Sequence, residues 1–156
     1  MKNIYYITRS YYPEITGGTI IRQKQVELLK KNGYNVIIVT LTNKKENEKI
    51  DKNEIRIYIS INILKVFLKF ERLGIVEDYL KKFGEKAEKI LNQKVKAEDI
   101  IFTTSGGELE CIKIGSILKK EKKCKFIINL HDPIDHTLVN GISLSKFYKL
   151  RDKIEK

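Results

Sequence analysis

The sequence is poor in cysteine, proline and long apolar runs, and each scarcity excludes a class of protein. Its two prolines and nine glycines leave no room for a low-complexity linker. Cys111 and Cys124 have neither a CxxC nor a metal-ligand spacing, which favours a reduced, cytoplasmic protein over a disulfide framework. No apolar run approaches the roughly 20 residues that span a bilayer, and the run at 4–8 is too short and too polar for a signal peptide.

The chain carries a large excess of positive charge. Its 31 lysines and arginines against 20 acidic residues give a formal charge of +11, which attracts nucleic acid, anionic lipid and phosphorylated substrates alike. No RNP-like strand, helix-turn-helix or zinc finger is present, so nucleic acid is not a predicted partner. A lysine-rich surface that only favours solubility is the commoner origin of such a charge.

Strand-like and helix-like segments alternate along the 156 residues, a length that suits one domain. Apolar patterns predict strands at 4–8, 35–42, 55–63, 99–104 and 125–130, and helices at 19–32, 76–91, 108–120 and 143–155. Thr19 is the expected cap of the first helix, and Gly33 follows its end. This order predicts an α/β fold, Rossmann-like and doubly wound, in which a mainly parallel sheet has helices on both faces.

A ligand site is expected where parallel strands end. The loops after the first, fourth and fifth strands carry Gly17-Gly18, Ser105-Gly106-Gly107 and His131-Asp132, and these loops share one edge of the predicted sheet. Glycine pairs that open helices let backbone N–H groups approach an anion, although each pair also suits a tight turn that binds nothing. Because GxGxxG and GxxxxGK[ST] are both missing, NAD enzymes and P-loop NTPases are poor interpretations.

The residues that follow the last predicted strand have an alternative interpretation as a metal site. His131, Asp132, Asp135 and His136 could ligate a metal, but Pro133 constrains the loop and no helical HExxH is present, so no metal is predicted.

A short basic amphipathic helix is expected after residue 62. Its apolar residues are Ile63, Val66, Phe67 and Phe70, and its basic residues are Lys65, Lys69 and Arg72. Such a helix could lie on an anionic membrane and deliver a lipid-linked acceptor. An ordinary sheet-packing helix with a basic solvent face is the slightly preferred interpretation.

Several segments resemble the N-terminal domain of family-4 GT-B glycosyltransferases. Residues 11–18 (YYPEITGG) resemble the family's YPPxxGG loop, and 28–36 (LLKKNGYNV) are similar to its eLakxLxxxGHeV segment. Residues 99–105 resemble its DvihxHs strand, and 126–133 its vxtxHDp strand end. Together these motifs cover nearly the whole chain in the family's order. The family's histidines in GHeV and DvihxHs are Tyr34 and Thr104 here, which puts secondary contacts in doubt.

The resemblance implies a sugar transferase that uses a nucleotide-sugar as co-substrate and no other cofactor. It implies that this domain holds a saccharide or lipid-linked acceptor, as in cell-surface polysaccharide or glycolipid synthesis, usually with retention and without a metal. Gly17, Gly18 and Thr19 would approach the donor diphosphate, with Ser105–Gly107 on the same edge. His131 would lie beside the transferred sugar, and Asp132 would orient the imidazole of His131 or the loop.

A second, donor-binding domain is part of the expected whole. The family's donor domain has an E-x7-E pair, and Glu46/Glu54 and Glu77/Glu85 match that spacing only by chance. We therefore expect residues 1–156 to be an acceptor-side domain that is inactive alone and peripheral, if membrane-bound, on the inner face. The alternative is a non-catalytic Rossmann-like module that binds an anionic ligand or membrane surface.

Overall fold

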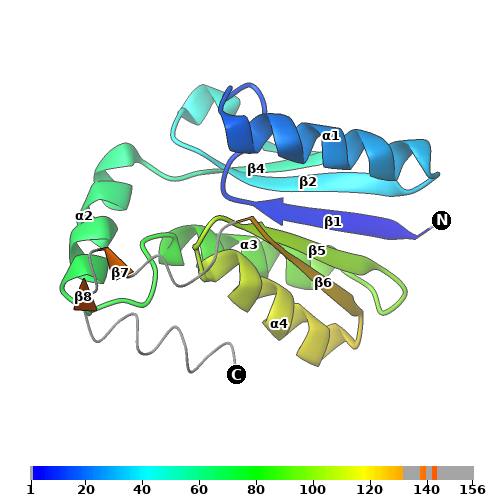
Figure 1. The fold of residues 1–156 in the computed structure, drawn as a ribbon. Helices are drawn as coiled ribbons and strands as arrows, with labels where there is room; N and C mark the ends of the chain where they lie inside the picture. The colour runs from blue at the N-terminus through cyan, green and yellow to red at the C-terminus, as the bar shows by residue number, and fades with distance from the viewer. Residues whose placement is uncertain (1, 132–137, 140–141, 144–156) are drawn as a thin grey trace.

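The structure is a computed structural model that describes residues 2–131, 138–139 and 142–143 (Figure 1). Helices and strands alternate along these residues, as the sequence predicts. The strands are β1 (Asn3–Thr8), β2 (Asn35–Thr42), β3 (Lys49–Ile50), β4 (Glu54–Tyr58), β5 (Ile100–Ser105), β6 (Lys125–Leu130), β7 (Leu138–Val139) and β8 (Ile142–Ser143). The helices are α1 (Gly17–Lys31), a 3-10 turn η1 (Lys45–Asn47), α2 (Ile61–Arg72), α3 (Lys81–Lys94) and α4 (Glu110–Lys122). The helix predicted at 143–155 lies almost wholly outside the described residues.

The main sheet has six strands in the order β3-β4-β2-β1-β5-β6. β4, β2, β1, β5 and β6 pair in parallel, and β3 is an antiparallel edge strand on β4. Its helices cover both faces, α1 on one side and α3 with α4 on the other (Figure 1). The predicted Rossmann-like α/β architecture is therefore confirmed. A two-stranded β7-β8 hairpin is separate from this sheet.

Each face of the sheet has its own apolar core because side chains alternate along a strand. Tyr6 of β1 packs with Val26 of α1 and stacks on Phe102, with ring centres 5.2 Å apart. On the opposite face, Ile7 of the same strand packs with Phe83 of α3. Both faces of β1 are thus buried, which explains the continuous apolar run in its sequence.

The first helix begins earlier than predicted, and Thr19 is not its cap. Thr16 is the cap, and its hydroxyl accepts a hydrogen bond from the Thr19 N–H (3.2 Å). The Thr19 hydroxyl in turn accepts from the Thr16 N–H at 2.7 Å, which completes a capping box. Gly17 and Gly18 are therefore the first residues of α1 rather than part of the preceding loop.

The third predicted strand is too long. β4 ends at Tyr58, and α2 starts at Ile61 behind Ser60, whose hydroxyl accepts from the Asn62 N–H. The alternating isoleucines of 55–63 therefore belong to a strand and then to a helix. The helix expected near residue 62 is confirmed with its start at Ile61, and only the end of the strand was predicted too late. Residues 43–53, where the sequence predicts neither a helix nor a strand, contain η1 and β3.

The packing of α4 on β6 depends on a glycine. A Cβ at Gly115 would overlap the ring of Phe126, whose backbone pairs with Ile101 of β5. A methyl group there forces the ring or the helix to move, which costs free energy although alanine favours a helix.

We expect Gly115→Ala to lower the free energy of unfolding by about 1–3 kcal/mol, the usual cost of overpacking a core. Ser116→Ala is the matched control, because Ser116 is exposed on the same helix. Urea unfolding followed by circular dichroism measures both variants. A Gly115→Ala protein as stable as Ser116→Ala would contradict this account of the helix–strand contact.

Candidate functional site

The order of the parallel strands reverses at one point, between β1 and β5. β2 and β4 extend the sheet on one side of β1, whereas β5 and β6 extend it on the other. The loops that leave β1 and β5 therefore diverge and open a crevice at the carboxyl ends of the strands, which is where open α/β sheets bind ligands. We call this rim, from Thr8–Ser10, Thr16–Thr19 and Ser105–Leu109 to His131, the carboxyl edge.

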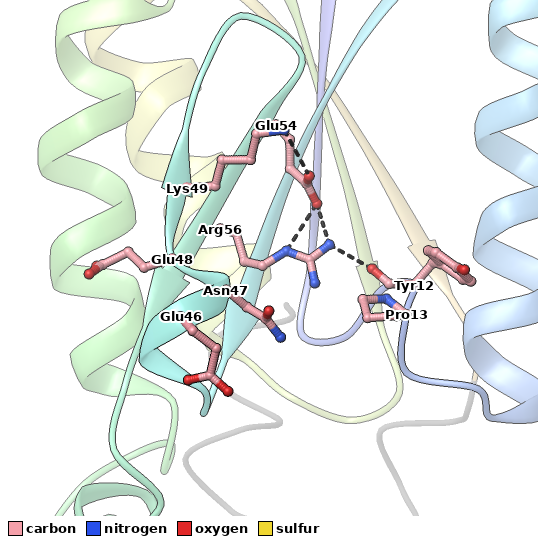
Figure 2. Close-up of a pocket in the computed structure, with 8 residues that line it drawn as sticks. All are labelled: Tyr12, Pro13, Glu46, Asn47, Glu48, Lys49, Glu54 and Arg56. Carbon is pink, nitrogen blue, oxygen red and sulfur yellow. Dashed lines mark hydrogen bonds and ion pairs between the residues drawn. The ribbon is translucent and has the colours of Figure 1, made fainter.

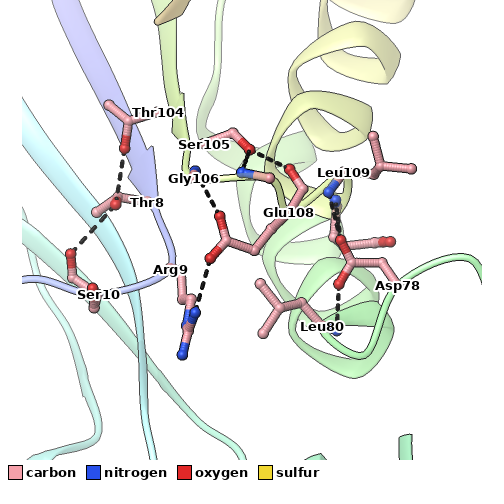
Figure 3. A network of polar contacts seen from close by, with 12 residues as sticks. Thr8, Arg9, Ser10, Asp78, Leu80, Thr104, Ser105, Gly106, Glu108 and Leu109 are labelled. Atoms are coloured by element: carbon pink, nitrogen blue, oxygen red, sulfur yellow. Dashed lines mark hydrogen bonds and ion pairs between the residues drawn. The ribbon is translucent and has the colours of Figure 1, made fainter. Parts of the chain in front are cut away.

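Polar side chains close the carboxyl edge between β1 and β5 (Figure 3). The Thr104 hydroxyl donates to the Thr8 hydroxyl at 3.0 Å, and both threonines are fully buried. Beside them, Arg9 Nη1 donates to Glu108 Oε1 at 3.0 Å. Arg9 is half-exposed at 51%, whereas Glu108 is buried at 7%. The Arg9 guanidinium also lies 5.5 Å from the centre of the Tyr79 ring.

Glu108 is held as a carboxylate. Burial alone would raise the pKa of Glu108, but hydrogen bonds from Arg9 and from the Gly106 N–H hold that pKa below its usual range. Its second oxygen accepts from the Gly106 N–H at 2.8 Å. The charge of Arg9 is therefore matched by an acid inside the protein.

The amides of the turn 105–107, predicted to contact an anion, donate instead to nearby side chains of the protein. The Gly107 N–H donates to the Ser105 hydroxyl at 3.0 Å, and that hydroxyl donates to the Glu108 carbonyl at 2.5 Å. Gly107 has φ of 108°, which glycine adopts without strain. Ser105, Gly106 and Gly107 thus remain predicted contacts only for a ligand that displaces Glu108.

His131 follows β6 on the same edge. Its backbone N–H donates to the Ser105 carbonyl at 2.9 Å, which places it next to the turn after β5. The histidine is half-buried. Asp132, predicted to orient it, lies outside the described residues, as do Asp135 and His136 of the alternative metal site. Within the described ranges, no group of three or more His, Cys, Asp or Glu side chains is arranged to hold a metal.

Gly17 and Gly18 present open amides at the start of α1. No described residue accepts a hydrogen bond from either N–H, as is usual for the first turn of a helix. Thr19 differs, since its N–H and its hydroxyl are both used in the capping box with Thr16. Of the three residues predicted to approach a diphosphate from this loop, only the two glycines have amides left to offer.

Arg9, Glu108 and Arg22 are site residues that the sequence did not reveal. Arg22 is 7% exposed, and its Nη1 donates to the Ser10 hydroxyl at 2.8 Å. A hydrophobic pattern assigns arginine to the solvent face of a helix, so nothing in the sequence marks Arg22 as buried. Arg9 directly follows the apolar run of β1, and that position at a strand end is the one signal that could have drawn attention to it.

A second polar cluster lies below the carboxyl edge, where α3 and α4 begin. The Asp78 carboxylate accepts from the N–H groups of Leu80 (2.7 Å), Leu109 (2.5 Å) and Glu110 (2.9 Å), so it fastens the starts of both helices. Burial nevertheless raises the pKa of Asp78. Burial and the neighbouring Asp78 raise the pKa of Glu110 to about 7. A cavity of about 210 Å³ opens beside these carboxylates, and Lys81 and Lys113 also line it.

An open hollow of about 380 Å³ lies between the first loop and the β3-β4 hairpin (Figure 2). Arg56 pairs with Glu54 and donates to the Tyr12 carbonyl at 2.6 Å, which ties the hairpin to the loop. The hollow is lined by Tyr12, Pro13, Glu46, Asn47, Glu48, Lys49, Glu54 and Arg56. It offers carboxylate, amide and aromatic groups, the types that bind hydroxyl-rich ligands.

No protein family and no curated protein matches the sequence. Among solved structures, the chain is similar to a phenylacrylic acid decarboxylase from Aquifex aeolicus, with 15% sequence identity. The match covers 99% of this chain and 97% of that one, with a TM-score of 0.29. A likeness at this level carries no conclusion about the reaction.

Glu110 predicts a pH dependence of stability. Its pKa is raised on folding, so between the ordinary value for glutamate and about 7 the unfolded chain loses a proton that the folded chain keeps. Stability therefore falls as pH rises through this window, and the loss levels off above it. Glu77, Glu85 and Lys113 also influence this carboxyl, with Lys113 opposing the shift.

We expect Glu110→Gln to match the parent protein near pH 5 and to be more stable by about 1–3 kcal/mol at pH 8, since each pKa unit corresponds to about 1.4 kcal/mol. Urea unfolding at a series of pH values measures the difference. Glu98→Gln, at an exposed turn, is the control and should keep the parent profile. Parallel profiles for the parent and Glu110→Gln would show that this carboxyl does not titrate differently on folding.

Proposed function

We propose that the chain is the acceptor-side domain of a GT-B, family-4-like glycosyltransferase. Such an enzyme moves a sugar from a nucleotide-sugar to a saccharide or lipid-linked acceptor in the synthesis of cell-surface polysaccharide or glycolipid. The observation that supports the proposal is that Gly17-Gly18 and His131 both lie on the carboxyl edge, at the start of α1 and directly after β6.

The proposed roles follow from the chemistry of that edge. In the transfer, the bond between the sugar carbon and the diphosphate oxygen breaks, and the acceptor oxygen bonds to the sugar while its proton passes to the leaving diphosphate. Negative charge grows on the leaving diphosphate, and open N–H groups at a helix N-terminus stabilise such charge. Gly17 and Gly18 have these groups. His131 would contact the transferred sugar, in a reaction that needs no metal.

The hollow beside Tyr12 suits the acceptor. Its carboxylates and its amide can accept hydrogen bonds from sugar hydroxyls, and the Tyr12 side chain is 57% exposed, which leaves its ring free to stack on a sugar. The first loop connects this hollow to Gly17, so acceptor and diphosphate would lie at the two ends of one segment.

The transfer reaction can be tested in the protein as the cell makes it, isolated through a tag at Met1. We expect transfer of radiolabel from a nucleotide-sugar to an endogenous lipid or polysaccharide, and we expect His131→Ala to reduce the rate at least about 100-fold, as loss of a group that contacts the reacting atoms does. His136→Ala is the matched control. Parent-like turnover by His131→Ala, with an unchanged unfolding midpoint, would remove that residue from the site.

A second candidate function, binding to an anionic membrane surface, is favoured by α2. None of its residues is buried, and Ile63, Val66 and Phe70 are 43%, 46% and 37% exposed. Lys65, Lys69 and Arg72 lie exposed on the same helix. None of the helices in the described part of the chain is long and apolar enough to cross a bilayer. An apolar surface bordered by lysines suits a peripheral helix, which in this chain would contact the inner face of the membrane.

Co-sedimentation with vesicles tests this role. We expect binding to phosphatidylglycerol vesicles that weakens with salt, and replacement of Lys65, Lys69 and Arg72 by glutamine should weaken it about 100-fold, given about 1 kcal/mol per basic residue at such a surface. The control replaces Lys119, Lys120 and Lys123, which are exposed near the end of α4. Equal losses in the two triple variants would mean that the net charge of +11 acts without a specific surface.

A further inference from the structure

Arg22 is a buried cation whose charge no described acid matches. Its side chain faces the sheet from the second turn of α1, and the residue is 7% exposed. Its one hydrogen-bonding neighbour among the described residues is Ser10, which accepts from Nη1, and its buried Nε–H has no acceptor. Burial of an unpaired guanidinium is unfavourable, so a site that keeps one has a reason outside ordinary packing.

Arg9 and Arg22 differ in whether an acid of the protein matches their charge. Arg9 is half-exposed and yet pairs with the buried Glu108 at 3.0 Å, whereas Arg22 is more deeply buried and pairs with no described carboxylate. Both arginines lie on the carboxyl edge. One is therefore already neutralised by the protein, and the other is available to an anion from outside.

Gly18 brings the open amides of α1 close to this guanidinium. A Cβ at Gly18 would lie 3.3 Å from Arg22 Nη1, a tight contact, whereas a Cβ at Gly17 would meet nothing within 4 Å. No described residue accepts a hydrogen bond from the N–H group of either glycine, and the helix N-terminus adds its own partial positive charge. The Arg22 guanidinium therefore lies beside Gly18, in the first turn of the helix that also carries the two amides.

We propose that Arg22, together with the N–H groups of Gly17 and Gly18, forms a seat for a phosphoryl group. The bound oxygens accept from the amides and from the guanidinium, and the anion matches the charge that the fold leaves unpaired. The assignment rests on the proposed function only in naming a diphosphate as the natural ligand. Arg22 is a binding residue here, and sugar transfer is not needed to detect it.

The test is a titration of the 156-residue chain with inorganic pyrophosphate at low salt, followed by amide and arginine Nε–H signals in ¹H–¹⁵N NMR spectra. We expect saturable shifts at Gly17, Gly18 and the Arg22 Nε–H, and a loss of affinity of about tenfold or more in Arg22→Gln, as for a lost charge-assisted hydrogen bond. Lys24→Gln is the matched control, an exposed cation on the same helix, and should change affinity less than twofold.

A glycine variant and a stability measurement distinguish a binding role of Arg22 from a purely structural one. Gly18→Ala should weaken pyrophosphate binding because its methyl group displaces the guanidinium. Gln23→Ala, at an exposed position of the same helix, should bind as the parent does. Without ligand, Arg22→Gln should unfold at the parent temperature or above it, since it removes an unpaired buried charge. Pyrophosphate should raise the unfolding temperature of the parent more than that of Arg22→Gln.

The proposal is overturned if no saturable shift occurs at the two glycines, or if Arg22→Gln and Lys24→Gln lose affinity equally. It is also overturned if Arg22→Gln unfolds at a lower temperature and pyrophosphate stabilises both proteins alike, because Arg22 would then be structural. These outcomes are independent of the transfer assay on His131. Pyrophosphate binding through Arg22 in a protein that transfers no sugar would support the seat and contradict the proposed enzyme.

Discussion

The ion pair between Arg9 and Glu108 is the contact on which the carboxyl edge depends. It joins the end of β1 to the turn after β5, at the point where the strand order reverses. The loops that follow these two strands diverge at this point. The same carboxylate accepts from the Gly106 N–H, so one side chain fixes both the width of the crevice and the shape of the second glycine turn. Truncating Arg9 would leave Glu108 buried without its partner, a change that costs far more than an exposed ion pair contributes. The geometry of the edge is therefore determined by electrostatics, whereas the sheet beneath it is determined by apolar packing.

This pairing divides the two glycine turns into different kinds of structure. The turn 105–107 is closed, because Glu108 and Ser105 take its amides. The turn at Gly17-Gly18 is open, because the capping box of Thr16 and Thr19 uses the third amide of α1 and leaves the first two. Sequence alone presents the two turns as equivalent, since both are glycine pairs that precede helices. The structure distinguishes them through the charged side chain beside each pair: Glu108 accepts from Gly106, whereas Arg22 lies beside Gly18.

The fold followed from the sequence because its signals are local and repeated. Continuous apolar runs marked β1, β2, β5 and β6, and for β6 the boundaries 125–130 were matched. The errors arose where two periods overlap, as at 55–63, or where an edge strand is short and polar, as in β3. The carboxyl edge was located correctly, since strand ends in a parallel sheet must meet. Its charge pairing could not be predicted, because Arg9 and Glu108 are 99 positions apart and only tertiary contact brings them together. The burial of Arg22 was hidden for a different reason. Arg22 lies on the same buried face of α1 as Thr19 and Val26, but a hydrophobic pattern assigns an arginine to solvent.

The positions of α2 and the carboxyl edge connect the two candidate functions. α2 follows the end of β4 directly, so it lies beyond the carboxyl ends of the parallel strands, on the side where α1 begins (Figure 1). A membrane under α2 would therefore lie next to the crevice and not behind the sheet. An acceptor held in such a membrane would reach the edge without leaving the bilayer surface, and the basic residues of α2 would raise the local concentration of anionic head groups there. Membrane binding through α2 and phosphoryl binding at Gly17-Gly18 could thus occur together on one side of the molecule. The same placement limits them, because an anionic head group and a donor diphosphate would compete for any unpaired cation. Among the described residues of this edge, Arg9 is paired with Glu108, whereas Arg22 has no acidic partner.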